Sequence, residues 1–187
     1  MADLPLRGRR VAVLAERLYE DLELWYPLLR FREAGARTVV VAPQVEAYLS
    51  KHGYAVRAEL ASVDARAEGF DAVIVPGGYC PDYLRRDGHL VSLVADVAAR
   101  GGIVGAICHG GWMLCSADVL RGRRATSHPA IRDDLVNAGA LWEDTEVVVD
   151  GPVVTSRRPE DLPAFCRTIA GLLAAATVPV TPAPHGR

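Results

Sequence analysis

The chain has 187 residues, of which 50% are hydrophobic and 24% are charged, and its formal net charge is −2. This length suits one domain, and the composition is that of a globular protein rather than a disordered one. With 21 basic against 23 acidic residues, the chain lacks the excess of positive charge that is typical of nucleic-acid-binding proteins. No run of about 18 apolar residues predicts a membrane span. We therefore expect neither a nucleic acid nor a membrane as partner.

The cysteines indicate a reducing compartment. Cys80, Cys108, Cys115 and Cys166 form no CxxC pair and no Cys/His cluster with the spacing of metal ligands. The first ten residues are polar and lack the apolar run of a secretory signal. We expect a cytoplasmic protein with free thiols and no bound metal.

Short apolar runs alternate with amphipathic segments, which predicts an α/β fold with a mostly parallel sheet. Core strands are expected at 11–15, 38–42, 70–76 and 103–107, and shorter strands at 124–127, 141–142, 147–149 and 153–155. Helices are expected at 20–34, 89–100, 109–120, 130–138 and 160–175, with a small hairpin around Gly53 beside the main sheet. Pro27 should either sit in the first turn of its helix or kink it. We expect one domain over 1–176 and a flexible, proline-rich tail over 177–187.

The most informative segment is 105–111, Gly-Ala-Ile-Cys-His-Gly-Gly, where a predicted strand runs directly into a turn and a helix. Small residues two positions before and after Cys108 are typical of a nucleophile elbow, because the backbone of the nucleophile is strained and a neighbouring strand lies close. The helix that follows should lower the pKa of the thiol and favour the thiolate. We interpret Cys108 as a reactive thiol rather than as a buried structural cysteine.

His109 follows Cys108 directly, so its ring need not face the thiol and can instead pair with a carboxylate from elsewhere in the fold. The alternative is a surface histidine at the start of a helix. This is the less natural role, because the positive end of the helix dipole disfavours an imidazolium there.

Glu20 is the first candidate for an acid beside the thiol. It follows the end of the first strand, and in a parallel sheet the carboxyl ends of the strands meet at one crevice. A buried, protonated Glu20 would donate a hydrogen bond to the Cys108 thiolate. We interpret Asp21 and Glu23 as charges that merely complement the helix N-terminus.

The loop after strand 70–76 supplies the other candidates. Asp82 follows this strand in Gly-Gly-Tyr-Cys-Pro-Asp, and its alternative role is that of a helix N-cap. Gly78 can offer a backbone N–H group to a developing oxyanion, and Gly77 belongs to the same candidate binding loop.

Several motifs together resemble the DJ-1/PfpI superfamily, and in particular its PfpI-type branch. The segment Glu-Asp-Leu-Glu-Leu-Trp-Tyr-Pro at 20–27 resembles the first-helix signature of that family. Further similar motifs are Lys-His-Gly-Tyr at 51–54, Pro-Gly-Gly at 76–78, Ala-Ile-Cys-His-Gly at 106–110, Leu-Arg-Gly-Arg at 120–123, Asp-Asp-Leu-Val-Asn-Ala-Gly at 133–139, Val-Val-Val-Asp-Gly at 147–151 and Thr-Ser-Arg at 155–157. The likeness covers about residues 9–175, and Pro-Asp-Tyr-Leu-Arg at 81–85 looks most like bacterial stress-protein members described as deglycases.

The resemblance implies a flavodoxin-like sandwich that works without a cofactor as a homodimer or a higher oligomer. It implies Cys108 as nucleophile, Glu20 as the buried acid at its sulfur and His109 as catalytic partner. It further implies that Asp82, where the intracellular peptidase members carry glutamate, reaches His109 of the neighbouring subunit.

The resemblance also assigns the binding groups and shows where this chain departs from the family. Backbone groups of Gly78 and His109 would form the oxyanion site, and His128 would contact the substrate. Cys80 stands where many relatives have alanine or serine, so it is either a resolving thiol for Cys108 across a subunit contact or a loop cysteine without a role. Trp112 and Met113 replace smaller or polar residues, which predicts a narrower pocket.

These residues support three hypotheses for the function. The first is a cysteine-dependent enzyme that acts on small, uncharged reactive carbonyls such as methylglyoxal or on glycation adducts, as a deglycase or a cofactor-free glyoxalase. The second is an oligomeric intracellular cysteine peptidase. The third is a redox-sensing or holdase-like stress protein whose Cys108 oxidises to a sulfinic acid. A hydratase or another tailoring enzyme is a further alternative, since one fold can host several chemistries.

Overall fold

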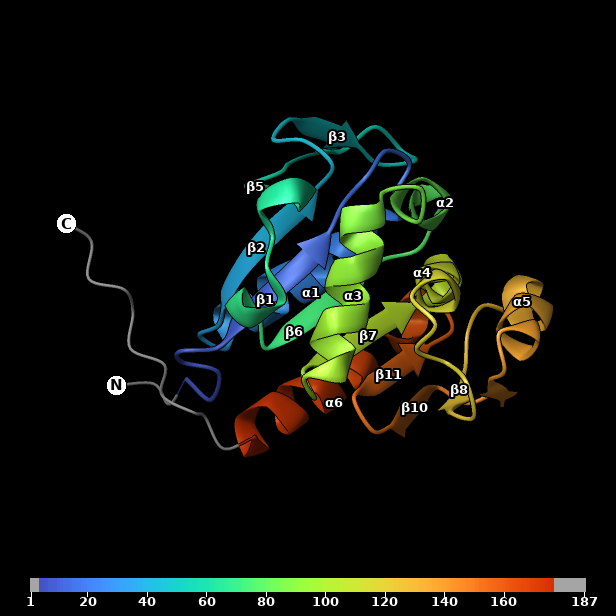
Figure 1. Ribbon diagram of the computed structural model, residues 1–187. Helices are drawn as coiled ribbons and strands as arrows, with labels where there is room; N and C mark the ends of the chain where they lie inside the picture. Colours follow the sequence, from blue (N-terminus) through green and yellow to red (C-terminus); the bar gives the residue numbers. More distant parts are fainter. Residues whose placement is uncertain (1–3, 177–187) are drawn as a thin grey trace.

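The computed structural model describes residues 4–176, so the predicted tail at 177–187 lies outside the described residues. A seven-stranded sheet forms the centre of the molecule, with the strand order β10-β11-β7-β6-β1-β2-β5 (Figure 1). All neighbouring strands are parallel except β10 and β11, which are antiparallel. The strands are β1 (Arg10–Leu14), β2 (Arg37–Ala42), β5 (Leu60–Ala61), β6 (Ala72–Val75), β7 (Ile103–Ile107), β10 (Val147–Asp150) and β11 (Val153–Ser156). The predicted α/β fold with a mostly parallel sheet is confirmed.

Helices cover both faces of this sheet (Figure 1). On one face, α1 (Asp21–Glu33) and α6 (Leu162–Ala175) pack against each other and against the strands below them. On the other face lie α3 (Gly88–Ala99) and α4 (Gly111–Ser116). The strands β6 and β7 are buried along their whole length and read as continuous apolar runs, which is typical of parallel strands covered on both sides.

Smaller elements surround the carboxyl ends of the strands. The predicted hairpin is present as β3 (Ala47–Leu49) and β4 (Ala55–Arg57), which pair antiparallel outside the main sheet. A short helix, α2 (Cys80–Leu84), follows β6. The strands β8 (Arg124–Ala125) and β9 (Leu141–Trp142) form a second small sheet, and α5 (Arg132–Asn137) lies between them in the chain. Among residues 4–176, no helix is long and apolar enough to cross a membrane.

Two local expectations are wrong, one strand was not expected, and one of the two alternatives for Pro27 is excluded. The helix expected at 109–120 is shorter, because a 3-10 turn at Cys108–Gly110 precedes α4. The segment at 80–84, expected as a loop, is helical, and the short edge strand β5 was not predicted. Pro27 lies at the seventh position of α1 rather than in its first turn, so it leaves the carbonyl of Glu23 without a helical N–H donor.

Gly105 in β7 and Gly171 in α6 offer a matched pair of glycine-to-alanine substitutions. A Cβ atom on Gly105 would lie 2.7 Å from Cδ1 of Ile169 and 2.9 Å from Cζ of Phe165, whereas Gly171 has nothing within 4 Å. We expect Gly105→Ala to lower the free energy of unfolding by about 1–3 kcal/mol through overpacking. Gly171→Ala should raise it by about 0.5–1 kcal/mol through helix propensity. Urea denaturation of both variants measures the two changes, and equal effects of the same sign would contradict this packing.

Candidate active site

The predicted turn between β7 and α4 places Cys108 in a strained conformation. Its φ angle is +59°, a left-handed value that residues other than glycine rarely adopt. The thiol therefore projects from the carboxyl end of β7 at the start of the 3-10 turn. This is the geometry of a nucleophile elbow.

Two glycines make room for this elbow. A Cβ atom on Gly110 would lie 2.5 Å from the carbonyl oxygen of Val75 in the neighbouring strand. A Cβ atom on Gly77 would lie 2.8 Å from Cβ of Cys108 and 2.6 Å from Oε2 of Glu23. Such distances are too short for any side chain, so both glycines are required by the close approach of β6 and its loop to the elbow.

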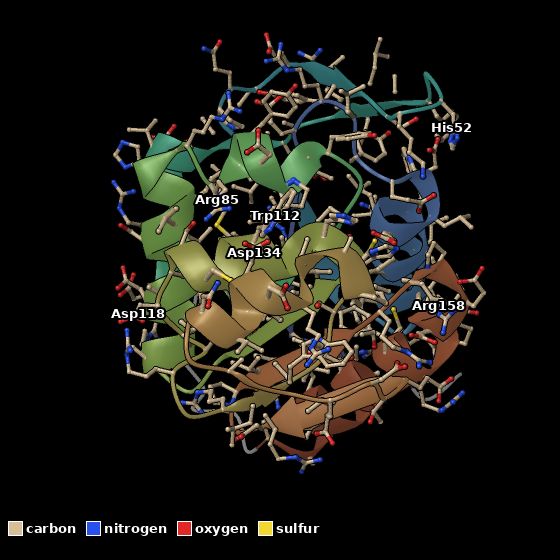
Figure 2. All side chains as sticks on the ribbon, turned by 90° about the vertical axis from the view of Figure 1, so that its right-hand side faces the viewer. His52, Arg85, Trp112, Asp118, Asp134 and Arg158 are labelled. Atoms are coloured by element: carbon tan, nitrogen blue, oxygen red, sulfur yellow. The ribbon has the colours of Figure 1, made fainter. Side chains whose placement is uncertain are left out.

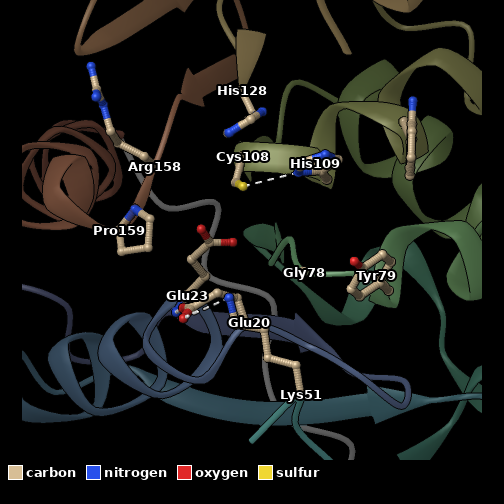
Figure 3. Close-up of a pocket in the computed structure, with 11 residues that line it drawn as sticks. Glu20, Glu23, Lys51, Gly78, Tyr79, Cys108, His109, His128, Arg158 and Pro159 are labelled. Atoms are coloured by element: carbon tan, nitrogen blue, oxygen red, sulfur yellow. Dashed lines mark hydrogen bonds and ion pairs between the residues drawn. The ribbon is translucent and has the colours of Figure 1, made fainter. Parts of the chain in front are cut away.

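A pocket of about 360 Å³ opens above the thiol at the carboxyl ends of the strands (Figure 3). The residues that line it come from six separate segments of the chain, so the complete fold is needed to assemble it. They are Glu20, Glu23, Lys51, Gly78, Tyr79, Cys108, His109, Trp112, His128, Arg158 and Pro159. Of these, the sequence predicted a place at the pocket for Glu20, Gly78, Cys108, His109, Trp112 and His128.

Glu23 is the carboxylic acid that faces the thiol. Its side chain is fully buried, and its Oε2 accepts a hydrogen bond from the N–H group of Gly77 at 2.7 Å. Its Oε1 has no hydrogen-bond partner among residues 4–176, and Figure 3 shows the carboxyl group pointing toward Cys108. Burial, reinforced by the nearby charge of Glu20, raises the pKa of Glu23 to about 7. The acid is therefore partly protonated at neutral pH.

The expectation that Glu20 contacts the sulfur is corrected. Glu20 is the N-cap of α1, and its Oε2 accepts the N–H of Glu23 at 2.9 Å, while its Oε1 lies 3.8 Å from Nζ of Lys51. An N-cap side chain folds back onto its own helix to satisfy a free N–H group, so Glu20 lines the pocket without facing the thiol. The expectation that Gly77 binds an oxyanion is also wrong. Its N–H group donates a hydrogen bond to Glu23 and is not available to an oxyanion.

The pKa of the thiol differs from the expectation as well. Burial and the neighbouring Glu23 carboxylate raise the pKa of Cys108, whereas the backbone N–H groups of His109 and Gly78 lower it. The net effect is a raised pKa, because desolvation by burial is the largest of these influences. Two adjacent negative charges disfavour each other. A thiolate at Cys108 therefore forms far more readily beside a neutral Glu23 than beside an ionised one.

His109 lies beside the thiol rather than turned away from it. Its Nδ1 is 3.3 Å from Sγ of Cys108 (Figure 3). Burial, with His128 and Lys51 nearby, lowers the pKa of His109 and favours the neutral ring. The backbone N–H groups of His109 and Gly78 both face the sulfur, as expected for an oxyanion site.

Two aromatic side chains hold the ring of His109 in place. The ring of His128 stacks on it at 4.7 Å between centroids, and the indole of Trp112 contacts it edge-on at 5.3 Å. Trp112 is itself tied to α5 by a hydrogen bond from Nε1 to Asp134 at 2.7 Å (Figure 2). Trp112 thus forms one wall of the pocket, as the sequence predicted.

Asp82 does not line the pocket of its own chain. It is a half-exposed residue within α2 and forms an ion pair with Arg86, which lies just beyond the end of this helix. Its alternative role as an N-cap is wrong, because Tyr79 occupies that position.

Cys80 is fully buried in its own chain, and this burial raises the pKa of its thiol. A buried thiol of this kind packs in the core, which favours the interpretation without a catalytic role. Cys80, Cys108, Cys115 and Cys166 are all free. Within residues 4–176, no group of three His, Cys, Asp or Glu side chains is arranged to hold a metal ion.

The raised pKa of Glu23 makes a prediction about stability. A carboxyl group with a pKa of about 7 in the folded protein and 4.5 in the unfolded chain favours folding only while it is protonated. Its contribution is fully present below pH 4.5 and is lost as the pH rises to 7. At 1.36 kcal/mol per pKa unit, this loss is about 3 kcal/mol.

Glutamine does not titrate, so Glu23→Gln should lack this loss. We expect the difference in unfolding free energy between Glu23→Gln and the unmodified protein to grow by about 3 kcal/mol in favour of the variant as the pH rises from 4.5 to 8. Urea denaturation of both proteins across this range measures the difference. Glu33→Gln, at an exposed position in the last turn of the same helix, is the matched control. A difference between Glu23→Gln and the unmodified protein that stays constant with pH would contradict the raised pKa.

Comparison with known proteins places these features in a family. The family model described as DJ-1/PfpI family matches residues 9–172. The chain is 44% identical to Deglycase TK1284 of Thermococcus kodakarensis over 164 residues, which cover 88% of this chain and 99% of the relative. It is 43% identical over 171 residues to Protein/nucleic acid deglycase 2 of Escherichia coli, covering 90% and 99%.

Two further comparisons extend this picture. The chain is 41% identical over 169 residues to the putative cysteine protease YraA of Bacillus subtilis, covering 89% of this chain and 99% of the relative. The crystal structure of Drosophila melanogaster DJ-1beta superposes with a TM-score of 0.82 at 26% identity, covering 90% and 91%. The match of the family model over most of the chain, the identity to these relatives and the shared fold show that the chain belongs to the DJ-1/PfpI family.

Proposed function

We propose that the protein is a cysteine-dependent deglycase or cofactor-free glyoxalase that acts on small reactive carbonyls or on their adducts with amines and thiols. The observation that carries this proposal is the convergence on one sulfur of a buried acid, an imidazole nitrogen and two backbone N–H groups. The deglycases of Thermococcus kodakarensis and Escherichia coli, at 44% and 43% identity, support it further.

The first step is the formation of the thiolate. The proton of Cys108 moves to the carboxylate of Glu23, whose raised pKa makes it a suitable acceptor. The pair keeps a single negative charge throughout, which avoids the repulsion between thiolate and carboxylate. Neutral Glu23 then donates a hydrogen bond to the sulfur and holds it in position.

The thiolate next attacks the carbonyl carbon of the substrate. A carbon–sulfur bond forms, the electron pair of the carbonyl bond moves to oxygen, and the N–H groups of Gly78 and His109 stabilise the oxyanion. A proton from Glu23 or His109 completes the hemithioacetal. His109 is kept neutral by its surroundings and can therefore accept a proton at Nδ1 and return it later.

The two reactions differ in the step that precedes this intermediate. In a glyoxalase reaction, the thiolate attacks the free dicarbonyl; the carbon that bears the sulfur then passes its proton to the neighbouring carbonyl carbon, the hydroxyl proton moves to the neighbouring oxygen, and water hydrolyses the resulting thioester to a hydroxy acid. In a deglycase reaction, the carbon–nitrogen bond of the adduct breaks first as its hydroxyl group becomes a carbonyl, and His109 relays the hydroxyl proton to the leaving nitrogen; the thiolate then attacks the released aldehyde, which follows the glyoxalase route. Both routes release an unmodified thiol at Cys108.

We propose that the protein works as a homo-oligomer in which Asp82 approaches His109 of the neighbouring subunit. An apolar stripe on the outer face of α1 supports the oligomer, since Leu22 and Leu29 are more than half exposed and Tyr26 lies between them. Tyr54 of the adjacent hairpin extends this surface. Exposed apolar patches of this kind are typical of subunit contacts.

The free cysteines support a reducing, cytoplasmic location.

The peptidase hypothesis is the second candidate, and the relative from Bacillus subtilis named a putative cysteine protease favours it. The same thiol would attack a peptide carbonyl. Cleavage of a fluorogenic peptide by the pure protein that is lost in Cys108→Ala would favour the peptidase over the deglycase.

Methylglyoxal consumption tests the proposed roles of the thiol and the acid. We expect Cys108→Ala to be inactive and Glu23→Gln to lose about 100-fold or more in kcat/KM, since glutamine can neither accept nor supply a proton. Glu20→Gln should lose less, because Glu20 acts on the helix and not on the sulfur. Cys166→Ala, a buried cysteine outside the pocket, is the control for thiol loss. Equal activity of Cys108→Ala and the unmodified protein would falsify the nucleophile assignment.

Sedimentation and activity measured together test the role of the neighbouring subunit. We expect Leu29→Glu, on the outer face of α1, to convert the oligomer to monomers by placing a charge in the contact. Asp82→Asn should keep the oligomer but lower kcat, because it removes the carboxylate that approaches the neighbouring His109, along with its ion pair to Arg86. A monomeric unmodified protein, or full activity of Asp82→Asn, would contradict the proposal.

A further inference from the structure

The charged side chains at the pocket are not equally available to a bound molecule. Glu23 accepts a hydrogen bond from Gly77, and Glu20 is shared between the N–H of Glu23 and the ammonium group of Lys51. Arg158 is exposed at the rim of the pocket and forms no ion pair with an acidic side chain of residues 4–176. It is therefore the pocket cation that a ligand can engage without breaking an existing ion pair.

The neighbours of Arg158 fix the position of its backbone at the pocket rim. Arg157 is anchored from Nε to Asp161 at 3.0 Å and from Nη1 to Asp144 at 2.7 Å. Pro159 begins a 3-10 turn on the other side and also lines the pocket. Held between these two residues, Arg158 has an extended backbone and a side chain that is free to turn at the pocket rim.

His128 adds a neutral donor on the same side of the pocket. Its Nδ1 accepts the N–H of Ala130 at 3.2 Å, so the neutral ring carries its proton on Nε2. Its main-chain N–H donates to the carbonyl oxygen of Cys108 at 3.2 Å, which ties the backbone of His128 to the elbow. Figure 3 shows Arg158 and His128 on one side of Cys108, with Lys51 on the opposite side.

We propose that Arg158 and His128 form a subsite for a negatively charged group, a carboxylate or a phosphate, attached next to the reacting carbonyl carbon. This inference rests on the proposed function and specifies its substrate class. Figure 3 shows the guanidinium of Arg158 directed away from Cys108, and an inward turn of this exposed side chain would bring it toward His128. A guanidinium and an N–H donor that converge in this way bind carboxylates and phosphates well. Methylglyoxal carries the reacting carbonyl without an anionic group, so it would occupy only part of this pocket.

The rates at which two alkylating agents modify Cys108 test the subsite without any turnover. Iodoacetate is anionic and iodoacetamide is its neutral counterpart, and both react with the same thiolate. We expect Arg158→Gln to lower the ratio of the iodoacetate rate to the iodoacetamide rate about fivefold, a modest factor because solvent screens an exposed charge. Peptide mass spectrometry assigns the modification to Cys108.

Two control variants separate the subsite from the overall charge of the protein. Arg158→Lys keeps the positive charge and should keep the ratio within about twofold. Arg37→Gln removes an exposed arginine at the opposite end of the sheet, and it should also leave the ratio within about twofold. An unchanged ratio in Arg158→Gln, or an equal fall in Arg37→Gln, would overturn the proposal.

Protection of Cys108 by reversible aldehydes distinguishes the two kinds of anion. Addition of the thiol to an aldehyde forms a carbon–sulfur bond and moves the thiol proton to the aldehyde oxygen, which slows alkylation by iodoacetamide. We expect glyoxylate or glycolaldehyde phosphate to protect at concentrations at least threefold lower than neutral glycolaldehyde, and Arg158→Gln to abolish the difference. Whichever anion protects better identifies the preferred group, and equal protection by all three contradicts the subsite. If methylglyoxal is not consumed while these differences persist, the proposed function fails and the subsite remains.

Discussion

The structure of the site depends on one contact, the placement of a buried carboxyl group against a buried thiol. Burial removes water from both groups and therefore disfavours the ionised form of each. A negative charge on one group disfavours ionisation of the other still further. Below about pH 7 both groups are neutral, and above it the pair carries one negative charge in place of two, with the remaining proton on either Glu23 or Cys108. A thiolate held by a neutral acid is a nucleophile that is both available and fixed in position.

The rest of the fold can be understood as the set of constraints that keeps this contact in place. Gly77 lies so close to both groups that no side chain is tolerated there, and its N–H group fixes one oxygen of Glu23. The left-handed backbone of Cys108 directs the sulfur toward the carboxyl group, and the tight packing of Gly110 on Val75 holds that backbone. The strain at the elbow persists because β6 and β7 are buried and paired along their length.

Much of this arrangement follows from local patterns in the sequence. The apolar runs and the small residues around Cys108 indicated the strands and the elbow, since both depend on neighbours within a few positions. Glu20 was expected at the sulfur because it follows the end of the first strand, but it is the N-cap of α1, and the acid that faces the thiol is Glu23, one helical turn later. Glu23 shares the buried face of α1 with Leu24, Pro27, Leu28 and Phe31, and this periodicity was the signal that could have identified it.

Other features could not be predicted, because they depend on how distant segments meet. Lys51 and Arg158 reach the pocket from the hairpin and from the loop after β11, and neither position shows a periodic pattern. Tyr79, which also lines the pocket, is the N-cap of the unpredicted helix α2. The direction of the thiol pKa was also missed, because it is set by burial and by Glu23, whose location is a property of the whole fold.

Infrared difference spectroscopy of the protonated carboxyl group is the most direct test of the contact between Glu23 and Cys108. Spectra of the unmodified protein and of Glu23→Gln are compared from pH 5 to pH 9. We expect a protonated carboxyl band that is missing from Glu23→Gln and that disappears with a midpoint near pH 7. The absence of this band at pH 6, or an identical band in Glu23→Gln, would contradict a neutral acid beside the thiol.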